Sequence, residues 1–196
     1  MRKRFPLRVR LVVAIAIALA PAACLYAATP APAAVAPHDG QHDFDFLFGT
    51  WKVHLKRLLH PLTGSTTWTE YVGTATARPV WGGRANLDEL EAENPTTHEH
   101  IEGLTLRLYN PATREWSLYW AAGKTGTLGL PPTVGHFEHG RGEFYDREDF
   151  QGRPIVVRYV WSDITPTSAH FEQAFSADDG KTWEVNWIYD ATRAKD

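Results

Sequence analysis

The sequence has almost no cysteine, since Cys24 is the single one among 196 residues. Beyond that position there is no disulfide and no cysteine nucleophile, so a hydrophobic core must supply the stability. A G-x-S-x-G nucleophile, a phosphate-binding P-loop and a dinucleotide fingerprint are also missing. No long helical period occurs. These absences exclude the familiar signatures of serine hydrolases, nucleotide-binding enzymes and helical bundles.

Positive charge is scarce after the first ten residues. The whole chain has a formal net charge of −3, and residues 1–10 hold five of its basic residues. Without those five cations the net charge becomes −8. No basic stripe follows, so the sequence predicts that nucleic acid is not a partner.

The N-terminus has the pattern of an export signal. Residues 1–10 are basic and residues 11–20 are wholly apolar, with small residues after them. The apolar run is too short to span a bilayer comfortably, which predicts a signal peptide over residues 1–24. A transmembrane anchor is the alternative. We therefore expect an exported protein, periplasmic or secreted.

Cys24 raises a second possibility for the same segment. The preceding Pro21-Ala22-Ala23 resembles a bacterial lipobox, in which the cysteine is lipidated and becomes the mature N-terminus. The alanines fit that pattern, whereas proline stands where leucine is usual. Two alternatives stay open. Cys24 is lipidated, which would give the protein its sole membrane contact, or the general signal peptidase cleaves the segment without lipidation. Residues 25–41, rich in Ala and Pro, predict a linker.

Residues 42–196 have the pattern of an antiparallel sheet. Short alternating runs are separated by turn signals such as Asn110-Pro111 and Asp179-Gly180. Such links favour an up-and-down meander, and a sheet of about ten strands without helices must close to bury its edges. A β-barrel is therefore predicted, with a β-sandwich as the alternative. The expected strands are 47–59, 66–78, 84–92, 99–109, 115–122, 133–138, 142–150, 154–163, 168–176 and 183–190.

Two distant features resemble the calycins. Gly49-Thr50-Trp51 is similar to the Gly-x-Trp signature on the first strand of lipocalins, and Arg193 follows the last expected strand. Stacking of a guanidinium on an indole gives a physical reason for pairing Trp51 with Arg193, both assigned structural roles. The stretches FDFLFGTW (44–51), WGGRANLDE (81–89), TLRLYNPATREWSLYW (105–120) and 157–193 resemble the DUF1579 family of bacterial exported proteins. That resemblance implies an all-β, lipocalin-like (calycin) barrel and brings no established activity.

Aromatic residues suggest a binding cavity. An interior with aromatic walls and a few polar groups suits a small organic ligand. We expect Trp120, Trp161 and Trp187 as walls. We expect Asn86, Glu89 and Gln173 as polar anchors. The leading hypothesis is an exported barrel that binds a small, partly apolar molecule.

Carboxylates leave two other functions open. A cofactor-free isomerase, cyclase or hydrolase would need catalytic carboxylates in the barrel. The candidates are Asp88, in the expected strand GGRANLDEL, and Glu172, which lies near His170 in the sequence. The opposing interpretation is that these acids face water. A third hypothesis is an envelope protein that works by surface contact. The sequence leaves the ligand and the oligomeric state open.

Histidines do not form a convincing metal set. His98 and His100 share one face of a strand, and His136 and His139 lie close in sequence, but neither pair has an evident third ligand. His170 is the best candidate for haem, with nothing diagnostic around it. We therefore predict no metal and no other cofactor.

The stretch SADDGKTW (176–183) has the form of an Asp-box, a motif that recurs in β-propellers. It occurs once here, in a chain too short for a six-bladed propeller at roughly 40–50 residues per blade. Asp178 can accept hydrogen bonds from the turn and Gly180 can take a positive φ. We interpret the motif as the hairpin that joins the last two strands.

Overall fold

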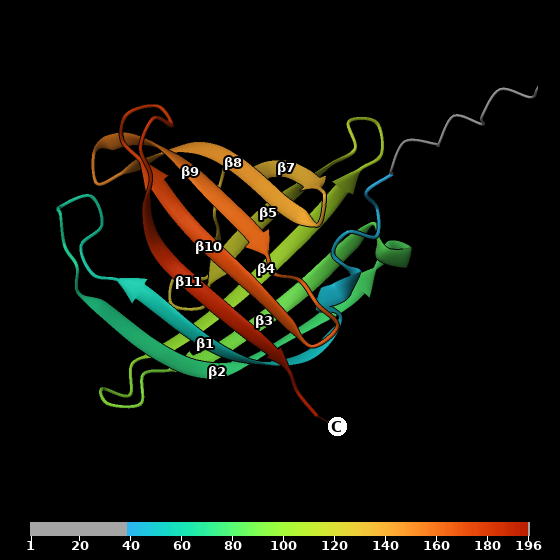
Figure 1. Ribbon diagram of the computed structural model, residues 1–196, viewed down its shortest axis with the longest axis horizontal. Coiled ribbons are helices and arrows are strands. Elements are labelled where there is room, and N and C mark those ends of the chain that lie inside the picture. Colours follow the sequence, from blue (N-terminus) through green and yellow to red (C-terminus); the bar gives the residue numbers. More distant parts are fainter. Residues whose placement is uncertain (1–38, 196) are drawn as a thin grey trace, which may run out of the picture. The chain divides into compact units, whose positions relative to one another are not determined.

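The computed structural model describes residues 39–195, which form β-strands joined by short loops (Figure 1). The expected signal segment and most of the linker lie outside these residues. Within 39–195, no helix has the length and apolar character to cross a membrane. The strands are β1 (Gly49–Leu58), β2 (Trp68–Val80), β3 (Ala85–Glu93), β4 (His100–Asn110), β5 (Glu115–Ala122), β6 (Thr127–Leu128), β7 (Thr133–Glu138), β8 (Arg141–Phe150), β9 (Arg153–Ser162), β10 (Ser168–Ser176) and β11 (Glu184–Arg193), with 3-10 turns η1 (Asp45–Leu47) and η2 (Trp81–Gly83).

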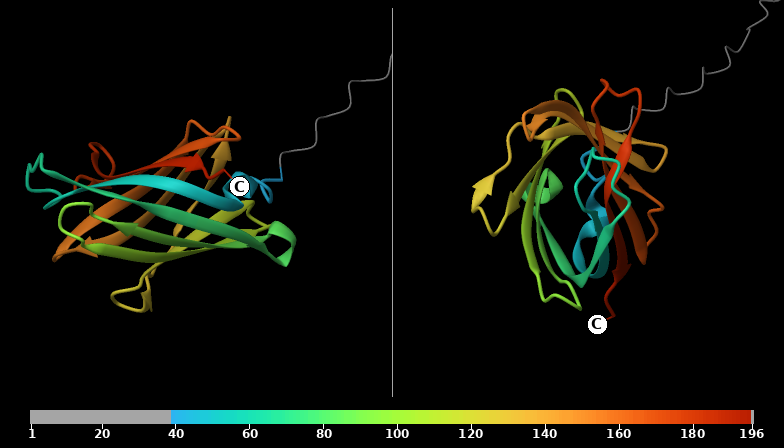
Figure 2. Two further views of the ribbon diagram at one scale, coloured as in Figure 1. Left: turned by 90° about the horizontal axis from the view of Figure 1, so that it is seen from below. Right: turned by 90° about the vertical axis from the view of Figure 1, so that its left-hand side faces the viewer.

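The strands close into an antiparallel barrel. Neighbours in sequence pair throughout, except that β7 pairs with β5 and the short β6 is added beside β5. Pairing of β1 with β11 and of β4 with β5 completes the ring, visible end-on in the right view of Figure 2. The predicted all-β barrel is confirmed in preference to the β-sandwich. Among residues 39–195, closure leaves no long edge strand unpaired, which is the physical advantage of this architecture.

One end of the barrel is filled by the segment that precedes β1. Phe44 is fully buried, and its ring contacts Trp116 on β5 and Phe144 on β8 at centroid distances of 5.1 and 5.6 Å. The indole of Trp51 donates a hydrogen bond to the Leu47 carbonyl, 2.8 Å away. The sequence placed the first strand from residue 47, whereas η1 occupies 45–47 and β1 begins at Gly49.

Arg193 covers Trp51 at this closed end. Its guanidinium carbon lies 3.9 Å from the centroid of the indole, and its Nη atoms donate to the carbonyls of Phe46 and Phe48. Gly49 has a φ of +104°, and a Cβ there would lie 3.1 Å from Arg193 Nη1. The glycine is thus favoured by its backbone conformation, and a Cβ there would also crowd the arginine. The Gly-x-Trp and terminal arginine form one structural unit.

A β-bulge changes the expected side-chain alternation of the last strand. Gln173 pairs with Trp187 while Ala174 pairs with Val185, so Asn186 is the extra residue on β11. Unbroken alternation along residues 183–189 would put Trp183 and Trp187 on the same face of the sheet, but the bulge puts them on opposite faces. Trp183 packs over Arg158, with its ring centroid 4.4 Å from the guanidinium carbon. The bulge shifts the register by one residue, which moves side chains to the opposite face.

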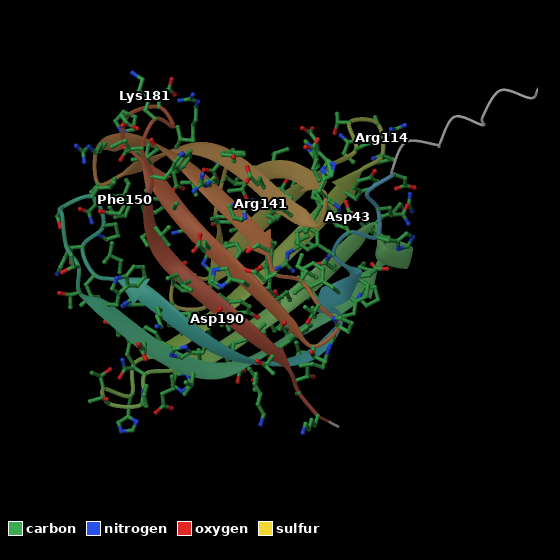
Figure 3. All side chains as sticks on the ribbon, viewed as in Figure 1. Asp43, Arg114, Arg141, Phe150, Lys181 and Asp190 are labelled. Atoms are coloured by element: carbon green, nitrogen blue, oxygen red, sulfur yellow. The ribbon has the colours of Figure 1, made fainter. Side chains whose placement is uncertain are left out.

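The Asp-box hairpin is held by Asp178. Its Oδ1 accepts hydrogen bonds from Thr182 N (2.9 Å) and Ser176 Oγ (2.8 Å), and its Oδ2 accepts one from Thr182 Oγ1 (2.7 Å). Gly180 has a φ of +84°. The loop stands at one end of the barrel, where Lys181 marks it in Figure 3. These contacts give the motif a local structural explanation.

We expect Asp178→Ala to lower the melting temperature at pH 7, measured by circular dichroism. The Thr182 and Ser176 hydrogen bonds hold the pKa of Asp178 down to about 2, so its stabilisation is present above about pH 4 and disappears as pH falls toward 2. The difference from the unmodified protein should therefore shrink in acid. Asp179→Asn, which removes only an exposed ion pair with Arg147, is the control. Equal losses in both variants would contradict this role of Asp178.

Candidate functional site

A cavity of about 250 Å³ lies inside the barrel, between β3, β4 and β5 on one side and β9, β10 and β11 on the other. Its polar lining residues are Asp88, Thr105, Arg107 and Gln173. This volume is below the roughly 300–1,000 Å³ of drug-sized pockets, so it suits a compact molecule. Its aromatic lining residues are Tyr119, Trp120, Tyr159, Trp161, Phe171, Trp187 and Tyr189.

Trp120 depends on a glycine opposite its ring. A Cβ on Gly103 would lie 1.7 Å from the indole Cη2 atom, so the side chain at position 103 must be absent for the ring to lie there. Gly103 is on β4, next to β5, which carries Trp120. Gly103 and Trp120 together therefore form this wall of the cavity.

Arg107 forms the polar centre of the cavity wall. Its Nη1 donates to Asn86 Oδ1 at 3.0 Å, and its Nη2 donates to Asp88 Oδ2 at 2.8 Å. All three residues are buried. The guanidinium carbon also lies 5.0 Å from the centroid of Phe44 and 5.8 Å from that of Trp161. A buried ion pair of this kind is stable only when further hydrogen bonds and ring contacts accompany it.

Asp88 keeps one oxygen free for a ligand. Within residues 39–195, its Oδ1 accepts no hydrogen bond, whereas Oδ2 is taken by Arg107. The Asp88 side chain is 12% exposed, against 3% for its arginine partner, and it lines the cavity. The free oxygen is therefore the acceptor that this centre offers to a bound molecule.

Gln173 is held by the residue that the bulge buries. Its Nε2 donates to Asn186 Oδ1 at 2.7 Å, and Asn186 is 2% exposed. A glutamine that lies among aromatic side chains needs such a hydrogen-bond partner. Asn186 itself was missed, because a bulge cannot be read from an alternating pattern.

The structure brings most of the expected binding residues together. Trp120, Trp161, Gln173 and Trp187 line the cavity, as does Asp88, expected as a catalytic candidate. Asn86 lies behind the wall, where it orients Arg107. Glu89 does not belong to this set.

Glu89 lies exposed on the outer face of β3. It is adjacent in sequence to Asp88 and to Leu90, both of which line the cavity. Because successive side chains of a strand point to opposite faces, Glu89 must point outward when its neighbours point inward. The structure therefore places Glu89, expected as a ligand anchor, away from this cavity.

His170 and Glu172 also face outward. His170 Nδ1 lies 2.7 Å from Asp190 Oδ1, and its Nε2 lies 3.4 Å from Glu172 Oε1. Figure 3 labels Asp190 on β11, whose outer side faces the viewer. Burial lowers the pKa of His170, but the hydrogen bonds to Asp190 and Glu172 outweigh it and raise the pKa overall. The expected general base and haem ligand thus stands on the barrel surface, away from the cavity.

Three other histidines that the sequence singled out each lie near one carboxylate. His98 and His100 both lie near Glu93, and His136 lies near Glu138. In the part of the chain that the structure describes, no three His, Cys, Asp or Glu side chains come together to hold a metal ion.

The sequence interpretation missed Arg107 because the pattern of its strand favours the opposite face as the buried one. Leu104, Leu106 and Leu108 alternate along β4, and such a pattern would normally mark the buried face. In the barrel these leucines are half-buried on the outer side, while Arg107 and Tyr109 are buried. The one available signal was Asn86 and Asp88 on β3, which need an inward partner if they face the core.

Asp146 on β8 is a half-buried carboxyl outside the Arg107 centre. It follows the buried Phe144 by two residues and so shares its inward direction. Its Oδ1 is enclosed without a hydrogen-bond partner. Burial, with a smaller contribution from the charge of Glu148, raises the pKa of Asp146 to about 7.

We expect Asp146→Asn to stabilise the protein more at pH 8 than at pH 5. Because the folded-state pKa lies above the unfolded one, stability is full below about pH 4 and is lost as pH rises toward 7. Asn removes that loss. After discounting for partial exposure, the free energy of unfolding should gain about 1–2 kcal/mol more at pH 8 than at pH 5. Urea unfolding measures it, with the exposed Glu91→Gln as control; a gain independent of pH would contradict the assignment.

Comparison with known proteins supports the fold of this chain and does not identify its function. No protein-family model and no curated protein matches the chain. It is similar in structure to the S-type phycobiliprotein lyase CPES from Guillardia theta, with a TM-score of 0.56, 12% identity, and coverage of 82% of this chain and 95% of that one. It is also similar to Rv2717c from M. tuberculosis, with a TM-score of 0.56, 11% identity, and coverage of 83% and 100%. Both are lipocalin-like barrels, and this chain shares their fold.

Proposed function

We propose that this chain is an exported, lipocalin-like binding protein that holds a small, partly apolar molecule in its barrel cavity. The observation that carries the proposal is the cavity itself, with seven aromatic lining residues and one polar centre. Membership of the DUF1579 group, export through residues 1–24 and a lipid on Cys24 are parts of the proposal that rest on the sequence.

The arrangement of charges favours binding over catalysis. Catalysis by acid and base needs two titratable groups that converge on one reacting atom. The carboxylate and guanidinium that line the cavity, Asp88 and Arg107, are already paired with each other. His170 and Glu172 lie on the outer face. A single paired centre in an apolar pocket is typical of a site that orients a ligand.

Native mass spectrometry of protein purified from its own host tests the proposal. We expect a small molecule that survives gentle ionisation and is released on denaturation. Thr105→Trp should abolish its retention, because position 105 lines the cavity and an indole would fill it. Leu106→Trp, one residue along on the outer face, is the matched control and should retain the molecule. Retention by both variants would place the molecule outside the cavity and refute the proposal.

A further inference from the structure

We infer that the cavity selects molecules with a positively charged nitrogen that donates a hydrogen bond, such as a protonated amine, and that Asp88 Oδ1 accepts it. The inference rests on the proposed function and names the class of its ligand. Three features of the described residues support it: the free carboxylate oxygen, the aromatic walls and the charge balance of the interior.

The free oxygen of Asp88 determines that the polar group of the ligand is a hydrogen-bond donor. A carboxylate oxygen only accepts hydrogen bonds, so its partner must be a donor. Arg107 occupies Oδ2 and is itself held by Asn86, which fixes the carboxylate in place. A charged N–H donor forms the stronger bond with such an oxygen, in a setting with little water.

The walls favour the same kind of group. Trp120, Trp161 and Trp187 present large π-systems around the cavity, together with Tyr159 and Tyr189. Cations are attracted to the faces of aromatic rings, and tryptophan is the strongest of them. Walls and carboxylate therefore act together on a cationic nitrogen.

The interior has no spare positive charge for an anion. Among the described residues that line the cavity, Arg107 is the one cation, and Asp88 already balances it. Asp146 faces the interior one strand away from Tyr159, with an enclosed oxygen that lacks a partner. A carboxylate ligand would add negative charge to this environment, whereas an ammonium ion would offset it.

Four two-ring probes of nearly equal size separate the possibilities: naphthalen-2-ylmethylammonium, naphthalen-2-ylmethanol, 2-ethylnaphthalene and 2-naphthoate. Equilibrium dialysis of the mature protein at pH 7 gives their dissociation constants. We expect the ammonium ion to bind at least about tenfold more tightly than the alcohol. A charged donor roughly doubles the free energy that a hydrogen bond contributes. The hydrocarbon should bind more weakly still, and the carboxylate weakest of all.

The outcomes distinguish this inference from the proposed function. If the alcohol, the hydrocarbon or the carboxylate binds as tightly as the ammonium ion, the selection for cations is refuted while small-molecule binding stands. If none of the four probes binds, both fail. These results come from the unmodified chain, so no variant has to fold for the inference to be decided.

Asp88→Asn locates the selection within the cavity. The amide keeps an oxygen for Arg107 but removes the charge, so the ammonium probe should lose about tenfold in affinity while 2-ethylnaphthalene is unchanged. Glu89→Gln removes the neighbouring outward charge and should leave all four affinities unaltered. Equal loss of the ammonium probe in both variants would show a general charge effect and overturn the role of Asp88.

Discussion

Replacing Arg107 with methionine is expected to destabilise the protein by about 3–5 kcal/mol, because it leaves the Asp88 carboxylate buried without a counter-charge. Asp88 accepts its one hydrogen bond within residues 39–195 from this arginine. Asn86 Oδ1 would lose its partner as well. For a domain of this size the loss corresponds to a fall in melting temperature of about 6–20 °C.

The partner variant separates charge from packing. In Arg107→Met/Asp88→Asn the uncompensated charge is gone, so more than half of the lost stability should return. Chemical denaturation of the four proteins of this cycle gives the coupling energy between the two side chains. Arg57→Met is the control, since Arg57 pairs with Glu99 near the surface and an exposed pair contributes less than about 1 kcal/mol. A loss as small as this for Arg107→Met would mean that the polar centre is solvated, contrary to the buried pair described above.

Trp51→Ala is expected to cost about 3–5 kcal/mol, the usual range for removing a large aromatic side chain from a core. Trp51 is 1% exposed, donates to the Leu47 carbonyl and carries the Arg193 guanidinium on its face. Its removal opens a cavity at the closed end and frees the segment that fills it. Thermal and urea unfolding measure the effect.

Trp81 offers a matched comparison for Trp51. It is 68% exposed, so Trp81→Ala should change the free energy of unfolding by no more than about 0.5 kcal/mol. If the two variants were equally stable, the indole of Trp51 would not be part of a packed core. Arg193→Met should fall between them, because the carbonyls of Phe46 and Phe48 lose charged donors while the indole remains.

The barrel could be predicted because its evidence is local. Alternating runs and turn residues such as Asp178 and Gly180 define strands and hairpins with little help from the rest of the chain. Closure follows from the absence of covering helices. Gly49, Trp51 and Arg193 could be linked only through a resemblance, and the structure shows the physical contact behind it.

The polar centre could not be predicted in the same way. Alternating leucines normally mark the buried face of a strand, but those of β4 lie on the outer side and Arg107 lies inside. The sequence did not distinguish Asp88 from its neighbour Glu89. Which of the two side chains lines the cavity depends on which face of β3 is turned inward. The bulge at Asn186 reversed the direction of Trp183 relative to Trp187.

The sequence by itself determined the strands, the turns and the aromatic content of this protein, since those depend on neighbours along the chain. The tertiary structure alone decided which face of each strand is inside. That choice depends on contacts between strands: Arg107 on β4 can face inward because Asn86 lies directly opposite it on β3 and Asp88 lies within reach. Burial of a charge is permitted only when its partners are buried with it, and the closed barrel encloses Arg107 together with Asn86 and Asp88.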